Sequence, residues 1–233
     1  MDVPFLLRTL PKLWPPLQVT IAVSLVSLGL GFALGISLGV LRVAIADWLP
    51  VRLAIDAYVW LVRGTPIIVQ IYAAFFLLPK IGIQLPLFWV GVVALTFNSV
   101  GYQIEIVRAA IASVSRGQRE AARAIGMSEG MTLRSILLPQ AVQRMIPPLT
   151  NELSNVVKAS SVLSAIALFE LHKASNAIAA STYKYVEVLL LQALLYFAVI
   201  QSLSWVARYL ETRVFAFDGE LAIEREQVAM VRA

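Results

Sequence analysis

Residues 13–41 read LWPPLQVTIAVSLVSLGLGFALGISLGVL, and no ionisable side chain interrupts this run of 29 residues. A transmembrane helix needs about 20 apolar residues to cross the hydrocarbon layer of a bilayer, whereas the apolar core of a secretory signal has only about 7–15. The run therefore predicts a membrane-spanning helix near residues 17–41 that stays in place as an anchor.

Four further stretches of the chain have the composition of membrane spans, near residues 58–79, 81–107, 134–157 and 186–210. The second carries Arg63 and is expected to be irregular at its start. The fourth contains Pro147 and Pro148 and is expected to be kinked. We therefore predict an all-α membrane protein in which residues 1–216 form a domain of five transmembrane helices, followed by a solvated tail over residues 217–233.

The composition of the 233 residues excludes several classes of protein. Hydrophobic residues make up 59% without counting glycine, and charged residues only 14%, against about 25% charged residues in soluble domains. An ordinary soluble enzyme and a disordered chain are therefore both excluded. The chain has no cysteine, and His172 is its single histidine, so we expect no disulfide, no thiolate nucleophile and no metal site.

Arginine residues concentrate in the connection between the third and fourth predicted spans, which holds Arg108, Arg116, Arg119, Arg123 and Arg134. Because Lys and Arg are enriched in short cytoplasmic loops, we predict that this connection lies in the cytoplasm. Five spans then place the N-terminus outside and the tail, residues 217–233, in the cytoplasm. The asymmetry accounts for most of the net charge of +5, so the charge does not indicate nucleic acid as a partner.

The same connection contains a short helical pattern near residues 117–126, which read GQREAARAIG. Good helix formers run from Gln118 to Ile125, and Gly126 stands where a left-handed C-cap is expected. A helix of about two turns is not stable alone in water, so something must pack on it, and Ala121, Ala122 and Ile125 offer a face for close approach. The alternative is a helix that lies along the membrane surface.

The spacing around this helix resembles a known family. Glu120-Ala121-Ala122 is followed after three residues by Gly126, and after nine more by residues 136–139, which read ILLP. This arrangement resembles the EAA loop in the membrane subunits of type I ATP-binding-cassette (ABC) importers. Residues 63–66 (RGTP), 102–108 (YQIEIVR) and 148–152 (PLTNE) narrow the resemblance to the permeases for polar amino acids such as histidine, arginine, glutamate and glutamine.

The resemblance implies a fold, a location and a set of partners. The fold is that of a type I ABC importer permease, in the bacterial inner membrane. The partners are the lipid bilayer, two ATPase subunits, a second permease subunit that is identical or homologous, and an extracytoplasmic amino-acid-binding protein. The resemblance assigns coupling to the ATPase to Arg119, Glu120, Ala121, Ala122, Ile125 and Gly126. The chain lacks a G-x-x-x-x-G-K-[ST] loop, so we expect no catalytic activity and no cofactor in this chain, with ATP and Mg bound by the partner.

Polar residues at membrane depth indicate where a solute binds, because such residues are costly there. The candidates are Asn98, Glu152, Asn155, Lys158, Ser160 and Ser161. Glu152, Asn155 and Lys158 follow one another at intervals of three, so a regular helix would place them in one stripe. A Glu and a Lys would match the ammonium and carboxylate groups of an amino acid. The alternative is an ion pair of Glu152 with Lys158 or Arg144 that fixes the kinked span.

A second group of residues is expected to be structural or to form a gate. Arg63, Thr65 and Pro66 interrupt the second span, and Glu105 is expected to pair with Arg108 three residues later. The first span also carries a face of small residues at intervals of four, which permits close helix approach: Ser27, Gly31, Gly35 and Gly39. This face fits either a contact between two subunits or packing within one.

One other class of function fits a polar-cored bundle of five helices. An ion channel or a secondary transporter that is not driven by ATP would have the same composition and span count. Such a protein would have no need for the spacing of the EAA loop, and this spacing therefore favours the importer.

Overall fold

The computed structural model describes residues 2–45 and 48–214, and the predicted tail over residues 217–233 lies outside them. The described residues form helices joined by turns and short loops: α1 (Val3–Ala44), α2 (Leu49–Gly64), α3 (Ile67–Lys80), α4 (Leu87–Ala112), α5 (Arg116–Ala124), α6 (Glu129–Thr132), α7 (Leu138–Ala159), α8 (Leu171–Thr182) and α9 (Tyr185–Val214). A π-helical turn, η1 (Leu133–Leu137), precedes α7, and a 3-10 turn, η2 (Ser160–Ile166), follows it.

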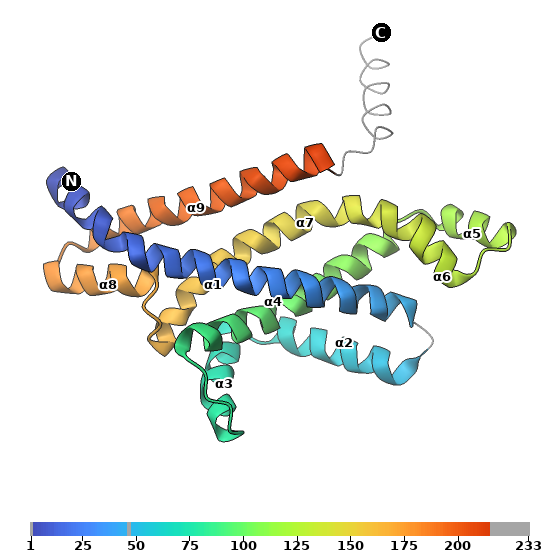
Figure 1. Cartoon of the computed structure of the whole chain (residues 1–233), viewed down its shortest axis with the longest axis horizontal. Coiled ribbons are helices and arrows are strands. Elements are labelled where there is room, and N and C mark those ends of the chain that lie inside the picture. Colours follow the sequence, from blue (N-terminus) through green and yellow to red (C-terminus); the bar gives the residue numbers. More distant parts are fainter. Residues whose placement is uncertain (1, 46–47, 215–233) are drawn as a thin grey trace, which may run out of the picture.

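The long helices run roughly along one axis, as expected for a protein that crosses a membrane (Figure 1). Helices α1, α4 and α9 are each long and apolar enough to span a bilayer. Two bent pairs supply up to two more spans: α2 with α3, bent by 110°, and the segment from α6 to η2 with α8, bent by 56°. The prediction of an all-α membrane fold is confirmed, and the count of five holds when each bent pair is one span.

Three of the predicted spans differ in extent from the helices that contain them. Helix α1 begins at Val3, well before residue 17, where the span is predicted to start, and the Asp2 side chain caps it by accepting the N–H of Phe5 at 3.0 Å. The segment predicted as a span over residues 58–79 is divided between two helices, α2 and α3, which are bent by 110° relative to each other. Helix α4 starts at Leu87 rather than residue 81, because the chain first turns through Gly82, which has a φ of +84°. The other predicted helices end within a few residues of those observed.

The break between α2 and α3 follows from Thr65 and Pro66. A residue before proline avoids the helical conformation, and Thr65 is extended, with φ −121° and ψ 141°. Such a break leaves carbonyl groups without helical partners, which is costly inside a membrane. The side-chain Nε2 of Gln70 donates to the carbonyls of Val62, at 2.9 Å, and of Thr65, at 3.2 Å. Gln70 therefore satisfies the backbone that the break exposes.

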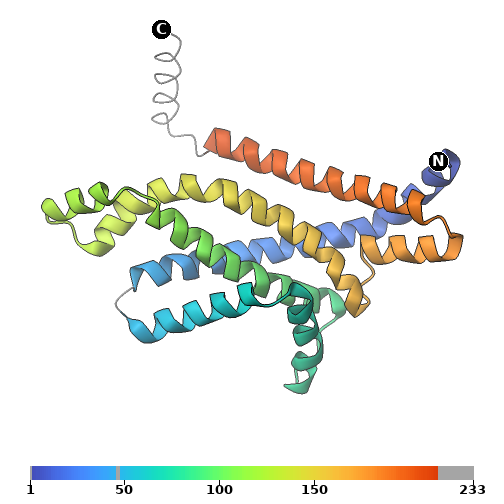
Figure 2. The same ribbon diagram turned by 180° about the vertical axis from the view of Figure 1, so that it is seen from behind.

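The core is built around the close contact between α1 and α4, which lie side by side in both views (Figures 1 and 2). A Cβ atom added at Gly35 would lie 2.6 Å from the Cβ of Gln103, and one at Gly39 would lie 2.7 Å from the Cβ of Val107. The Ser27 hydroxyl donates to a carbonyl of α4 at 3.4 Å. The small-residue face of α1 thus packs within this chain, which is the second of the two alternatives left open by the sequence.

The end of the molecule near the start of α1 is held together by a buried carboxylate. Glu170 has no exposed surface and caps α8 by accepting the backbone N–H groups of His172 and Lys173. It also accepts hydrogen bonds from Tyr196 of α9 at 3.0 Å and from Thr20 of α1 at 3.4 Å. Glu170 therefore joins α1, α8 and α9, while α5 and α6 lie at the opposite end of the bundle (Figure 1).

We predict that Gly35→Ala lowers the free energy of unfolding in detergent by about 1–3 kcal/mol, because the added methyl group overpacks the α1–α4 contact. Gly29→Ala on the same helix is the matched control, since a Cβ atom there meets nothing within 4 Å. The control is expected to be as stable as the parent protein or slightly more stable. Equal stability of the two variants would contradict this account of the contact.

Candidate functional site

A cavity of about 280 Å³ opens where the α2–α3 break faces α4 and α7. Its lining includes Thr65, Pro66, Asn98, Tyr102, Glu152 and Asn155, and further apolar side chains from α3, α4 and α7 complete it. Five of these six were predicted as site or gate residues from the sequence, and Tyr102 appeared there only within the quoted motif. The cavity is therefore the place where distant polar segments of the sequence meet.

Glu152 is the charged residue of this cavity, and it is only 4% exposed. The Ser99 hydroxyl donates to its Oε1 at 2.8 Å, and Gln103 donates to Ser99 at 2.9 Å. In the described part of the chain, no Lys, Arg or His forms an ion pair with Glu152. Arg144 donates instead to the carbonyl and hydroxyl groups of Ser113. The alternative of an ion pair that fixes the kinked span was therefore wrong.

Asn98 connects the cavity to the helix break. Its Nδ2 donates to Oε1 of Gln70 at 3.0 Å, and Gln70 in turn bonds the hydroxyl of Thr65 at 2.9 Å. Sequence reasoning missed Gln70 and Ser99. Gln70 is the one amide side chain in the uncharged run 64–79, and this isolation was a signal that could have revealed it. Ser99 is one of many hydroxyl residues in apolar helices, and nothing in the sequence marks it.

The predicted polar stripe is divided between two sides of α7. Asn155 lines the cavity of Glu152 and also a second cleft, between α7 and α9, whereas Lys158 lines only the second cleft. Ser160 and Ser161 line neither. Their hydroxyl groups donate at 2.7 Å to carbonyls three residues earlier in the chain. The prediction of a single stripe was wrong for Lys158. Six residues of an α-helix correspond to a net rotation of about 120° around its axis, so Lys158 lies on a different face of α7 from Glu152.

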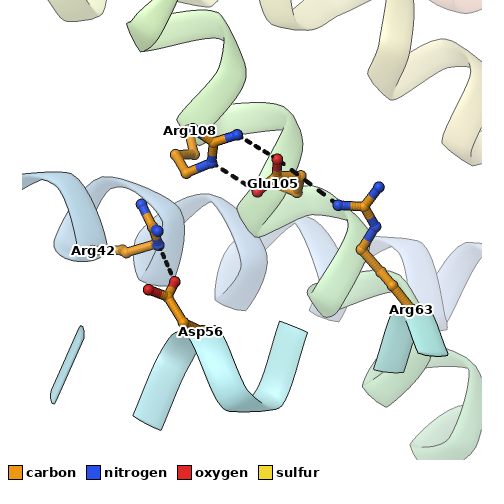
Figure 3. A network of polar contacts seen from close by, with 5 residues as sticks. All are labelled: Arg42, Asp56, Arg63, Glu105 and Arg108. Atoms are coloured by element: carbon orange, nitrogen blue, oxygen red, sulfur yellow. Dashed lines mark hydrogen bonds and ion pairs between the residues drawn. The ribbon is translucent and has the colours of Figure 1, made fainter. Parts of the chain in front are cut away.

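The five residues in Figure 3 form two ion-pair groups beside this site. Arg108 contacts Glu105 at 2.5 Å, as the spacing of three residues predicted, and Arg63 of α2 lies 3.8 Å from the same carboxylate. Arg63 also stands over the ring of Tyr102. Arg42 pairs with Asp56 at 2.5 Å. Through Arg63 and Tyr102, the first group ties α2 to α4 next to the cavity, and the second group ties α1 to α2.

Helix α5 ends as its sequence predicted. Gly126 has a φ of +79°, and the N–H groups of Met127 and Gly126 donate to the carbonyls of Ala122 and Arg123, both at 3.0 Å. This pair of bonds is the Schellman motif. Ala122 is buried within the chain, so it does not belong to a free docking face, whereas Ile125 is 77% exposed. Glu120 and Ala121 are also exposed, and Arg119 is half-buried.

Comparison with known proteins identifies the class to which this fold and site belong. Residues 31–216 match the family described as binding-protein-dependent transport system inner membrane components. The chain belongs to this family, and it has the fold of a type I ABC importer permease.

Individual relatives agree with this assignment. The chain is 33% identical over 210 residues to the "Arginine transport system permease protein ArtQ" of Bacillus subtilis (strain 168), covering 90% of this chain and 95% of the relative. It is 39% identical over 204 residues to the "Probable glutamine ABC transporter permease protein GlnP" of the same organism, covering 86% and 93%.

Solved structures resemble the chain over nearly its whole length. One, an "amino acid ABC transporter with histidines", superposes with a TM-score of 0.82 at 30% identity, covering 92% of this chain and 99% of its own. The inward-facing MetNI methionine ABC transporter has a TM-score of 0.71 at 23% identity, covering 93% and 100%. The second likeness concerns the fold alone.

We predict that Gln70→Leu lowers the free energy of unfolding by about 1–3 kcal/mol, because it leaves buried carbonyls at the α2–α3 break without a donor. Gln84→Leu makes the same chemical change in the exposed turn before α4 and should have little effect. Thermal unfolding of both variants in detergent, followed by tryptophan fluorescence, measures the difference. A fully stable Gln70→Leu protein would show that the amide does not support the break.

Proposed function

We propose that this chain is the permease subunit of an ATP-driven importer that moves a polar amino acid across the bacterial inner membrane by alternating access. The observation that carries the proposal is Glu152, a buried carboxylate that faces a cavity at membrane depth and has no cationic partner among the described residues. An ionisable group is retained at such a position when function requires it. The names of the relatives, which include arginine and glutamine permeases, support an amino acid as the solute.

In this proposal the solute brings the positive charge that the cavity lacks. Its ammonium group, or a cationic side chain, meets the carboxylate of Glu152, and Asn98 and Asn155 supply neutral hydrogen-bonding groups beside it. Tyr102 and Thr65 complete the polar wall. Lys158, Ser160 and Ser161 are not among the proposed ligands, because they do not line this cavity.

We predict that Glu152→Gln weakens the apparent affinity for the transported amino acid by roughly 5- to 150-fold, the equivalent of about 1–3 kcal/mol for a charge-assisted hydrogen bond. Assembly with the partner subunits should persist, because no ion pair is broken. Glu187→Gln, at the start of α9, is the matched control for loss of one carboxylate. Uptake of labelled amino acids into vesicles measures the effect, and normal uptake by Glu152→Gln would refute the assignment.

The link to ATP in this proposal is helix α5. It follows α4 after a short turn and precedes α7 through α6 and η1, and both α4 and α7 line the cavity. A movement of α5 therefore pulls on two walls of the solute site at once. The exposed Glu120, Ala121 and Ile125 offer the surface on which a separate ATPase docks, with Arg119 at its edge and Gly126 setting the end of the helix. That partner binds ATP and Mg, while a second permease subunit and an extracytoplasmic binding protein complete the complex.

We predict that Gly126→Val reduces binding of the ATPase subunit and its stimulated ATP hydrolysis, because a β-branched residue tolerates a positive φ poorly. Gly82→Val is the matched control. Gly82 also has a positive φ and open space around it, but it lies in the turn between α3 and α4, away from α5. Coupled ATP hydrolysis in a reconstituted complex measures the effect. Equal losses in both variants would indicate general strain, and full activity of Gly126→Val would show that coupling to the ATPase does not depend on how α5 ends.

The proposed orientation places the N-terminus outside and α5 in the cytoplasm, and the arginine residues around α5 support it. The chain contains no cysteine, so a single introduced cysteine reports its own location. We predict that Gln118→Cys in intact cells is protected from a membrane-impermeant thiol reagent, whereas Ile83→Cys is labelled. Both positions are exposed on the isolated chain. The reverse labelling pattern would invert the topology and remove α5 from the ATPase.

A further inference from the structure

A second cleft, of about 410 Å³, lies between α7 and α9, and Asn155 is the one residue that lines both this cleft and the cavity of Glu152. Helix α7 contributes Asn151, Ser154 and Lys158, and helix α9 contributes Gln201, Ser204 and Arg208. Each set has the spacing i, i+3, i+7, which places its members on one helix face. The hydroxyl groups of Ser154 and Ser204 meet across the cleft at 3.4 Å. Two matched polar stripes therefore face each other within helices that are otherwise largely apolar.

Two positively charged side chains, Lys158 and Arg208, line the cleft, and the side chains that the structure describes form no ion pair with them. The nearest acidic residue on α7, Glu152, faces the other cavity. The remaining polar groups of the cleft are hydroxyls and amides, which donate hydrogen bonds. A ligand complementary to this lining is an oxyanion with several acceptor oxygens, such as a phosphate.

The surroundings of the cleft indicate how that phosphate arrives. Helix α9 is largely exposed on the isolated chain, and only 6% of its most apolar stretch of 18 residues is buried. Phe197, four residues before Gln201, is 63% exposed, and Trp205, next to Ser204, is 64% exposed and stacks on Tyr209. Trp and Tyr are enriched at the level of lipid headgroups. Arg208 lies six residues before the end of α9, at a depth from which a long cationic side chain reaches the headgroup region.

We propose that this cleft binds the phosphate of an anionic phospholipid, with Arg208 and Lys158 contacting its oxygens and the acyl chains lying along the exposed apolar face of α9. Basic pockets between transmembrane helices are known sites for such headgroups. A free phosphate ion offers the same oxygens, but it has no acyl chains that would cover the apolar surface beside the cleft.

The test compares lipid binding to the purified transport complex in detergent that contains equal amounts of phosphatidylglycerol and phosphatidylcholine, measured by native mass spectrometry. The wild-type protein is expected to retain phosphatidylglycerol preferentially. The double variant Lys158→Gln/Arg208→Gln should lower this preference by about 30-fold. Lys12→Gln/Lys173→Gln removes the same charge outside the cleft and should keep the preference, as should the charge-conserving variant Lys158→Arg/Arg208→Lys.

Several results would overturn the proposal. Absence of a lipid preference in the wild-type protein would do so, as would an unchanged preference in Lys158→Gln/Arg208→Gln. Binding of inorganic phosphate that excludes phosphatidylglycerol would make free phosphate the occupant. Loss of the second permease subunit with the lipid preference intact would make the cleft a protein contact. If the glutamine variant cannot be recovered folded, lipid binding to the wild-type protein is measured at increasing salt concentration. A preference for phosphatidylglycerol that falls with rising salt supports the site, and a preference that salt leaves unchanged refutes it.

Discussion

The rest of the structure depends on the close approach of α1 and α4. Glycine residues at intervals of four on α1 let its backbone approach α4 closely. The side chains of Gln103 and Val107 on α4 occupy the space that Cβ atoms at Gly35 and Gly39 would need. Lipid does not drive helices together as water does, so packing of this kind is a principal source of helix association in membranes. Once α4 is held against α1, its opposite faces are available to carry α2, α3 and α7.

The second constraint is the cost of polar groups away from water. Pro66 breaks a helix inside an apolar segment, and the amide of Gln70 repairs the exposed backbone and then holds Asn98. Ser99 similarly donates a hydrogen bond to the buried carboxylate of Glu152, and Gln103 donates one to Ser99. The groups that satisfy buried polar atoms thus also hold Asn98 and Glu152, two polar residues that line the cavity.

The order of elements along the chain relates the two ends of the molecule. The α5 helix lies between α4 and α7 in sequence, and these two helices reach from it to the walls of the cavity. Glu170 fixes α8 to α1 and α9 at the far end. The end of the molecule at Glu170 is therefore fixed by hydrogen bonds, the middle holds the polar cavity, and α5 lies at the opposite end. A movement of α5 would be transmitted through α4 and α7 to the cavity.

The sequence by itself determined the membrane class, the long helices, the end of α5 at Gly126 and the family, because hydropathy, cap residues and motif spacing are local properties of the chain. It also identified Asn98, Glu152 and Asn155, since a polar residue in an apolar run stands out without a structure. Only the tertiary structure decided that the glycine face of α1 packs on α4, in contacts that join residues such as Ser27 and Val92, 65 positions apart. It likewise decided that Lys158 faces α9 while Glu152 faces α4, because the spacing of residues along a helix does not reveal which neighbour each face will meet.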